Sequence, residues 1–134
     1  MAKPSLLIVD DEVHLTLLYE EELEDVGYDV DVANTDEEAF ELLYGKTYDL
    51  VIVEPVTMRW KELNSVRSSL RRVKKTKLLF NTTSLALEQG ISCVADASVT
   101  KSSDISLLKE IIGKLLEPLL LDTPHPKDRN LIHA

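Results

Sequence analysis

The feature that most constrains the fold is a short apolar run at residues 50–53, which ends on a carboxylate and a proline. The run reads Leu-Val-Ile-Val and is followed by Glu54 and Pro55. Such a run is too short for a helix with its own core face and is typical of a strand buried on both faces of a parallel sheet. Pro55 lacks a backbone N–H and pushes Glu54 into an extended conformation, so it ends the strand. We therefore expect Glu54 at the carboxyl end of a central strand, where open α/β sheets bind ligands.

Four further segments have the length and composition of strands. They are residues 5–9, the alternating residues 28–33, residues 77–81 and a segment within 91–100. Helical segments alternate with these strands along the chain. This alternation predicts an α/β protein with a parallel sheet, right-handed crossovers and helices on both faces.

Five segments are expected to be helical, at residues 13–26, 37–44, 59–73, 85–89 and 105–116. In the first, apolar residues recur with a helical period and predict its buried face. These residues are Val13, Leu17, Leu18, Leu23 and Val26. Gly27 is expected to cap this helix, and Asn34–Asp36 to open the second. The last helix is expected to end at Pro118, with an inward stripe of Ile105, Leu108, Ile111, Ile112, Leu115 and Leu116.

Length and charge limit the classes of protein to consider. The 134 residues fit one domain, expected to span residues 1–120 and to be followed by a polar tail at 121–134. The net charge of -9 argues against nucleic acid or an anionic membrane as the main partner. A single cysteine, Cys93, cannot form an intrachain disulfide, and no stretch is long enough to span a bilayer. A cytoplasmic location is therefore expected.

The charge is unevenly distributed along the chain. Residues 1–58 contain 16 acidic and 2 basic residues, whereas residues 59–77 contain 8 basic residues and one acidic residue. The molecule is therefore expected to be bipolar. The basic segment is either a solvated face or a docking site for an anionic partner or a second copy of this chain.

Polar side chains follow several of the predicted strands. Asp10 and Asp11 follow the first strand, Glu54 the third, Thr82 the fourth and Lys101 the fifth. Because the ends of parallel strands converge on one edge of the sheet, these residues are expected to meet. Carboxylates that converge repel one another unless a cation lies among them, so we expect a Lys101–Glu54 contact. The hydroxyl at the end of the fourth strand could be supplied by Thr83 in place of Thr82.

Together these segments resemble the receiver domain of two-component response regulators. The resemblance is carried by LLIVDDE at 6–12, DLVIVE at 49–54, LLFNT at 78–82 and ADASVTK at 95–101. It implies a flavodoxin-like (CheY-like), doubly wound, five-stranded parallel sheet in the order 2-1-3-4-5, between two layers of helices. In that family an Asp at the end of the third strand takes a phosphoryl group from a histidine kinase or a small phosphodonor.

The resemblance also implies roles for the residues at the strand ends. Asp10, Asp11 and the acceptor residue would hold Mg²⁺, helped by the backbone carbonyl of Val56. Thr82 and Lys101 would bind the phosphoryl oxygens. Carboxylates and water are the ligands that Mg²⁺ prefers, and phosphoryl transfer depends mainly on positioning and charge neutralisation.

The sequence departs from the family pattern at several positions. Glu54 stands in the place of the acceptor Asp, and Ser98 stands where an aromatic residue moves with the switch hydroxyl. Ser102 replaces the proline that follows the lysine, so we predict a trans Lys101–Ser102 peptide. These departures indicate a degenerate receiver, in which Glu54 is predicted not to lock the domain fully into a phosphorylated-like state.

Three functions are consistent with the sequence. The first is a non-enzymatic pseudo-receiver, which binds a histidine kinase or a downstream signalling protein either without phosphorylation or with Glu54 imitating it. The second is a Mg²⁺-dependent phosphoacceptor that tolerates Glu54. The third is a small flavodoxin-like nucleotide or flavin binder, although the chain has only four glycines and no glycine-rich phosphate loop.

Overall fold

The computed structural model of the protein describes residues 3–55, 76–82, 95–102 and 104–121. The helices expected at 59–73 and 85–89 lie outside the described residues. The elements in chain order are β1 (Ser5–Val9), α1 (Val13–Val26), β2 (Asp29–Ala33), α2 (Asp36–Gly45), β3 (Leu50–Val53), β4 (Lys77–Thr82), β5 (Ala97–Thr100) and α4 (Ser106–Leu121).

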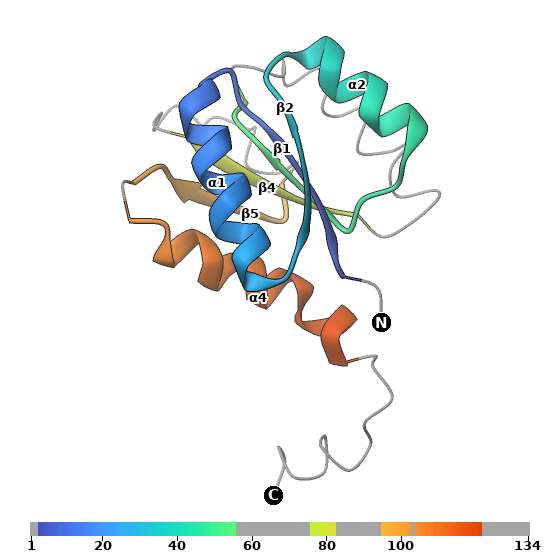
Figure 1. The fold of residues 1–134 in the computed structure, drawn as a ribbon. Helices are drawn as coiled ribbons and strands as arrows, with labels where there is room; N and C mark the ends of the chain where they lie inside the picture. Colours follow the sequence, from blue (N-terminus) through green and yellow to red (C-terminus); the bar gives the residue numbers. More distant parts are fainter. Residues whose placement is uncertain (1–2, 56–75, 83–94, 103, 122–134) are drawn as a thin grey trace, which may run out of the picture.

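The five strands form one parallel sheet in the order β2-β1-β3-β4-β5, as predicted (Figure 1). β1 pairs with both β2 and β3, with Leu6 opposite Val30 on one side and opposite Leu50 on the other. β3 is buried along its whole length. The uninterrupted apolar run at residues 50–53 therefore marks a strand that is covered on both faces of the sheet.

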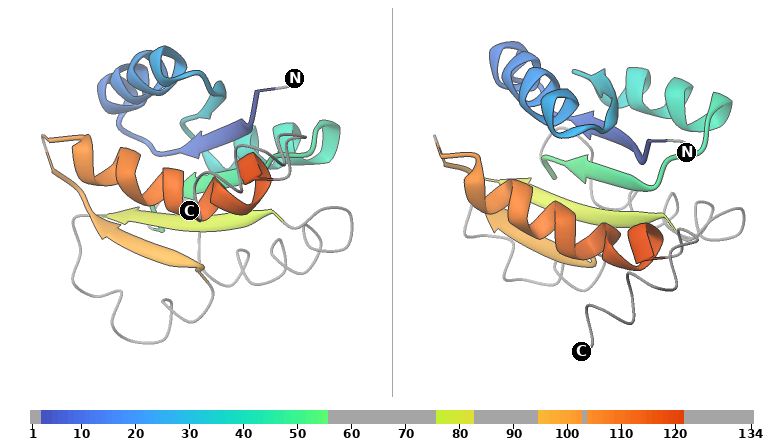
Figure 2. Two further views of the ribbon diagram at one scale, coloured as in Figure 1. Left: turned by 90° about the horizontal axis from the view of Figure 1, so that it is seen from below. Right: turned by 60° about the horizontal axis from the view of Figure 1, so that its bottom comes forward.

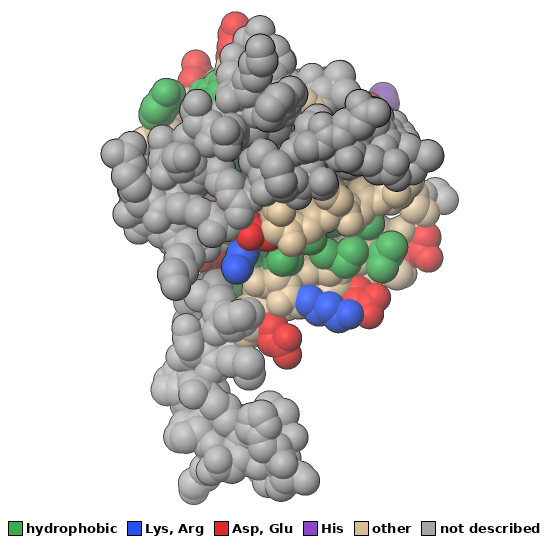
Figure 3. Space-filling model, turned by 180° about the vertical axis from the view of Figure 1, so that it is seen from behind, with side chains coloured by type: hydrophobic (Ala, Val, Ile, Leu, Met, Phe, Trp, Pro, Cys, Tyr) green, Lys and Arg blue, Asp and Glu red, His purple; other side chains and the backbone are tan. Residues whose placement is uncertain are grey.

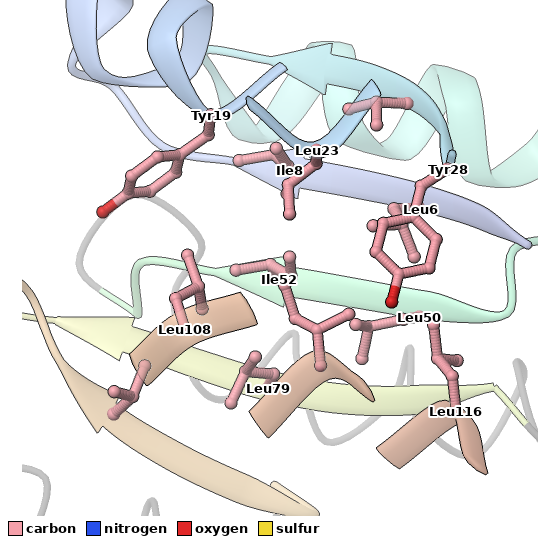
Figure 4. Packing of buried hydrophobic residues seen from close by; sticks show 13 residues of the cluster. Leu6, Ile8, Tyr19, Leu23, Tyr28, Leu50, Ile52, Leu79, Leu108 and Leu116 are labelled. Atoms are coloured by element: carbon pink, nitrogen blue, oxygen red, sulfur yellow. The ribbon is translucent and has the colours of Figure 1, made fainter. Parts of the chain in front are cut away.

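The described helices divide between the two faces of the sheet (Figures 1 and 2). Alternate side chains of a strand point to opposite faces. Leu6 and Ile8 pack on the side of α1 and α4, together with Leu79. Leu7 and Val9 pack on the opposite side, where α2 lies. Figure 4 shows the first of these two hydrophobic clusters. The predicted three-layer arrangement is confirmed.

The predicted buried face of α1 is wrong in most of its residues. Val13, Leu17, Leu18 and Val26 are 46–55% exposed, and of the predicted set Leu23 alone is buried. The buried stripe is formed by Thr16, Tyr19 and Leu23.

Two of the three side chains in this buried stripe are polar, and both find partners. The Thr16 hydroxyl donates to the carbonyl of Val13 at 2.9 Å and accepts from Asn34 Nδ2 at 3.0 Å. The Tyr19 hydroxyl accepts from Asn81 Nδ2 at 3.0 Å. Satisfied polar groups can be buried at little cost, so apolar periodicity alone selected the wrong stripe.

The ends of α1 and α2 follow the expected local signals, whereas the end of α4 does not. Gly27 ends α1 with φ 116, a left-handed conformation that glycine adopts without strain. The Thr35 hydroxyl accepts from the Glu38 N–H at the start of α2. α4 continues through Pro118 to Leu121, although proline cannot donate a backbone hydrogen bond within the helix. The expected helix end at Pro118 is therefore wrong.

The inward stripe of α4 agrees with the prediction. Leu108, Ile112 and Leu116 are buried, and Ile105, Ile111 and Leu115 pack partly buried against the same cluster.

Figure 3 shows that described lysine and acidic side chains lie side by side on the face seen there, below a strip of hydrophobic side chains. Within the described ranges, no helix combines the length and apolar character needed to cross a membrane.

Candidate functional site

Backbone hydrogen bonds that continue the sheet bring four of the predicted residues to one edge. The Asp10 N–H donates to the carbonyl of Ala33 at 3.0 Å, and the Glu54 N–H donates to that of Val9 at 2.8 Å. The Lys101 N–H donates to the carbonyl of Thr82 at 2.9 Å. The positions of these side chains are therefore fixed by the register of the strands that precede them.

Burial separates the acidic residues at this edge into two groups. Asp10 is 2% exposed and Glu54 is 6% exposed, whereas Asp11 and Glu12 are exposed. A buried carboxylate needs hydrogen bonds or a cation to offset the loss of its hydration. Asp10 and Glu54 therefore depend on the groups that surround them.

The Lys101 ammonium is that cation, and it contacts three carboxylates. Its Nζ lies 2.7 Å from Asp10 Oδ2, 3.0 Å from Glu12 Oε1 and 3.4 Å from Glu54 Oε2. Burial lowers the pKa of Lys101, but hydrogen bonds to Asp10 and Glu12 and the charges of Asp10 and Glu54 outweigh this effect and raise the pKa above its usual value. Lys101 is therefore positively charged throughout the physiological range.

The predicted Lys101–Glu54 contact is present, but it is the longest of these three contacts. Thr82 Oγ1 donates to Glu54 Oε1 at 3.4 Å, and the Thr82 side chain is buried. The alternative hydroxyl, Thr83, lies outside the described residues. One carboxylate oxygen of Glu54 thus faces Thr82, at the end of β4, and the other faces Lys101, directly after β5.

Donors of the same chain contact both carboxylate oxygens of Asp10. Its Oδ1 accepts from the Glu12 N–H at 3.0 Å, while its Oδ2 contacts Lys101. Its backbone carbonyl accepts from Asn34 Nδ2 at 2.8 Å. Both carboxylate oxygens of Asp10 therefore have donors, which fixes the orientation of this side chain.

Sequence reasoning missed three residues of this region, namely Glu12, Tyr19 and Asn81. Glu12 directly follows the acidic pair, so the run Asp-Asp-Glu at 10–12 was a signal that could have identified it. Figure 4 shows Tyr19 at the end of the hydrophobic cluster nearest the carboxyl ends of the strands, with its hydroxyl turned away from the cluster. Burial raises the pKa of Tyr19, although the hydrogen bond from Asn81 and the charge of Lys101 act in the opposite direction.

Comparisons with known proteins identify the family. No protein-family model matches the chain, and no curated protein sequence matches it. Among solved structures, the response regulator TrrA from Thermotoga maritima, in complex with Mg²⁺-BeF, is 35% identical with a TM-score of 0.72. The match covers 84% of this chain and 99% of TrrA. The chain belongs to the response regulator receiver (CheY-like) family.

Two further solved structures are similar to this receiver. One is TrrA in complex with the histidine kinase ThkA, which is 36% identical with a TM-score of 0.70, over 84% of this chain and 98% of TrrA. The other is the chemotaxis response regulator CheY4 of Vibrio cholerae, at 22% identity and a TM-score of 0.75, over 86% of this chain and all of that chain. The CheY4 match supports the fold alone.

Carboxylates that could coordinate a metal ion lie between β1 and α1. Asp10, Asp11 and Glu12 each offer a carboxylate oxygen, and these oxygens lie within 4.8 Å of one another. The set predicted from the sequence shares Asp10 and Asp11 with this group. It also includes Glu54 and the carbonyl of Val56, which lies outside the described residues, so the predicted set stays a prediction.

The remaining predicted positions of the receiver lie on and after β5. Ser98, in the place of the family's aromatic residue, is exposed and pairs with Phe80 of β4. The described residues contain no cis peptide bond, so the Lys101–Ser102 bond is trans, as predicted.

Proposed function

We propose that this receiver is a pseudo-receiver, a protein-interaction module of two-component signalling that does not accept a phosphoryl group. The observation that supports this most directly is the environment of Glu54, the residue at the position of the family's acceptor Asp. Both of its oxygens face donors of its own chain, Thr82 at 3.4 Å and Lys101 at 3.4 Å. In the family the same hydroxyl and lysine would bind the phosphoryl oxygens.

Side-chain length is the second argument for this proposal. Glutamate has one more methylene than aspartate, which displaces the carboxylate by about 1.5 Å. A misplacement of about 1 Å can cost on the order of 100-fold in a reaction that depends on alignment. The carboxylate oxygen of Glu54 is therefore proposed to lie out of line with the phosphorus atom of a bound phosphodonor.

The proposed partner is a protein, either a histidine kinase or a downstream signalling protein. The support is the family membership and the solved complex of TrrA with the histidine kinase ThkA. The net charge of -9 favours a protein over nucleic acid or an anionic membrane. In this proposal the domain is cytoplasmic, acts without catalysis of its own and binds Mg²⁺ weakly.

The second candidate is a receiver that still accepts a phosphoryl group on Glu54 with the help of Mg²⁺. A specific observation favours it, because Asp10, Thr82 and Lys101 lie around Glu54 as phosphoryl transfer would require. The two candidates differ in one outcome only, which is whether a covalent phosphoryl group appears on the protein.

Intact-mass spectrometry after incubation with acetyl phosphate and Mg²⁺ separates the two candidates. We expect no added phosphoryl mass on the wild-type chain or on Glu54→Gln, and partial phosphorylation of Glu54→Asp, whose shorter side chain restores the acceptor. A phosphoryl adduct on the wild-type chain that disappears in Glu54→Gln would overturn the pseudo-receiver proposal in favour of the working acceptor.

A further inference from the structure

Around the Lys101 ammonium, carboxylates outnumber cations; the Glu12 side chain is 59% exposed, whereas those of Asp10 and Glu54 are buried. Three carboxylates, those of Asp10, Glu12 and Glu54, lie within 3.4 Å of its single ammonium group. The Lys101 side chain is only 8% exposed, and the Asp10 side chain only 3%. Clustered carboxylates repel one another unless a cation lies among them, and low exposure strengthens both the repulsion and the attraction to a cation.

Two of the three carboxylates that could hold a divalent cation, those of Asp10 and Glu12 but not that of Asp11, are also contacts of Lys101. Asp10 and Glu12 belong to the group of acidic residues whose oxygens approach one another closely enough to share a metal ion. The same two residues make the two shortest contacts to Lys101 Nζ, at 2.7 and 3.0 Å.

The remaining oxygen of Asp10 is also committed in the structure. Its Oδ1 accepts from the Glu12 backbone N–H at 3.0 Å. Mg²⁺ requires oxygens at about 2.0–2.1 Å in near-octahedral geometry. A divalent cation and an ammonium group that share these carboxylates would also repel each other. The described arrangement therefore disfavours a metal ion at Asp10 and Glu12 while Lys101 is in place.

We propose that the Lys101 ammonium is the resident cation of this site and weakens the binding of divalent cations there. Glu12 contributes by giving Lys101 a third carboxylate, beyond Asp10 and Glu54. Lys101 thus balances carboxylate charge in the unphosphorylated protein, which is separate from any contact with a phosphoryl group. The proposal concerns the entry of metal ions, and its test uses no phosphodonor, so it can fail while the proposed function stands.

The test measures Mn²⁺ affinity of the full chain by electron paramagnetic resonance, which detects free Mn²⁺. The variants are wild type, Lys101→Met and the matched control Lys109→Met. Lys109 is also paired, with Glu22 at 2.8 Å, but it lies on α4 outside this site. We expect Lys101→Met to bind Mn²⁺ at least about tenfold more tightly than wild type, and Lys109→Met to bind like wild type. Equal affinities of wild type and Lys101→Met would overturn the proposal.

Thermal unfolding with and without Mg²⁺ keeps the proposal testable if Lys101→Met folds poorly. Without its resident cation this variant is expected to have a lowered Tm. Binding of a cation to the folded state should then raise the Tm in about 10 mM Mg²⁺ by mass action, with little change in wild type or Lys109→Met. A Lys101→Met chain that stays unfolded in Mg²⁺, or whose Tm rises no more than that of wild type, would contradict the proposal.

Discussion

At the scale of single residues, Tyr19 connects the hydrophobic core to the polar edge of the sheet. Its ring belongs to the cluster between the sheet and helices α1 and α4, while its hydroxyl accepts a hydrogen bond from Asn81 Nδ2. Asn81 precedes Thr82 on β4 and is itself buried. The hydroxyl of Tyr19 therefore satisfies a buried amide directly beside the candidate site.

Removing this hydroxyl should destabilise the protein. Tyr19→Phe leaves a buried amide donor without its partner, and such a loss costs about 1–3 kcal/mol in the free energy of unfolding. Urea denaturation measures it. The control is Tyr44→Phe, because Tyr44 is 89% exposed and its substitution should change stability by no more than about 0.5 kcal/mol. Equal effects of the two substitutions would show that the Tyr19–Asn81 hydrogen bond contributes nothing.

A second tyrosine forms a hydrogen-bonded pair with a carboxylate at the opposite end of the sheet. The Tyr48 hydroxyl donates to Asp31 Oδ2 at 2.7 Å, and Lys46 Nζ lies 3.1 Å from the same oxygen. The bond from Tyr48, and to a lesser degree Lys46, lowers the pKa of Asp31 below its usual value of 3.8 despite partial burial. Burial and the neighbouring Asp31 raise the pKa of Tyr48.

Because of this pair, we expect the free energy of unfolding to depend on pH in the acidic range. Because the pKa of Asp31 is lower in the folded state, its stabilising contribution is present above the unfolded value near 3.8 and is lost as the pH falls through the folded value. Tyr48→Phe removes the largest cause of the shift. The free energy of unfolding of this variant should therefore decrease less between pH 5 and pH 2 than that of wild type.

Urea denaturation at a series of pH values measures this difference, and Tyr44→Phe is again the control. An acid dependence of Tyr48→Phe that is as steep as that of wild type would show that Tyr48 does not lower the pKa of Asp31.

Residue types at the strand ends could be predicted from the sequence, but the partners of each residue could not. The position of Asp10, Glu54, Thr82 and Lys101 at one edge follows from the convergence of parallel strands. The two shortest contacts of Lys101, with Asp10 and Glu12, depend on the path of the loop after β1, where the Glu12 N–H bonds back to Asp10. No periodicity in the sequence encodes that path.

At the scale of elements, strands were easier to predict than the orientation of helices. A strand such as β3 has one sequence signature, because both of its faces are buried. A helix in contact with the sheet can bury either of two stripes when polar groups find partners, and α1 buries Thr16 and Tyr19 in place of Leu17 and Leu18. The end of α4 was missed because proline was assumed to stop a helix that continues through it.

The orientation of α1 can be tested with a matched pair of leucines. Leu23→Ala removes a fully buried side chain and should cost about 2–5 kcal/mol in the free energy of unfolding. Leu17→Ala removes a side chain that is 55% exposed, and it should change stability by less than about 1 kcal/mol. Chemical denaturation measures the free energy of unfolding of the two variants. A larger loss for Leu17→Ala than for Leu23→Ala would mean that α1 presents the other stripe to the sheet.

At the scale of the whole molecule, the fold of a receiver is retained, and a lysine of the same chain contacts the carboxylates of the candidate site. The five-stranded sheet and the membership of the response regulator family are both established. The site brings together Asp10, Glu54, Thr82 and Lys101, yet Glu54 and Lys101 already contact each other. A phosphoryl group brings a charge of about -1.5 to -2 and three acceptor oxygens, whereas Glu54 offers one charge and two oxygens. We therefore predict that Glu54 imitates a phosphorylated residue only in part.

The most direct test of this account is the two-dimensional ¹H–¹⁵N NMR spectrum of the chain before and after addition of Mg²⁺ and beryllium fluoride, a phosphoryl analogue. We expect the amide signals of Thr82 and Lys101 to stay unchanged in the wild-type chain, because Glu54 does not present an oxygen in line for the analogue. The same signals should shift in Glu54→Asp. Saturable shifts of Thr82 and Lys101 in the wild-type chain would contradict the account and indicate a working phosphoacceptor site.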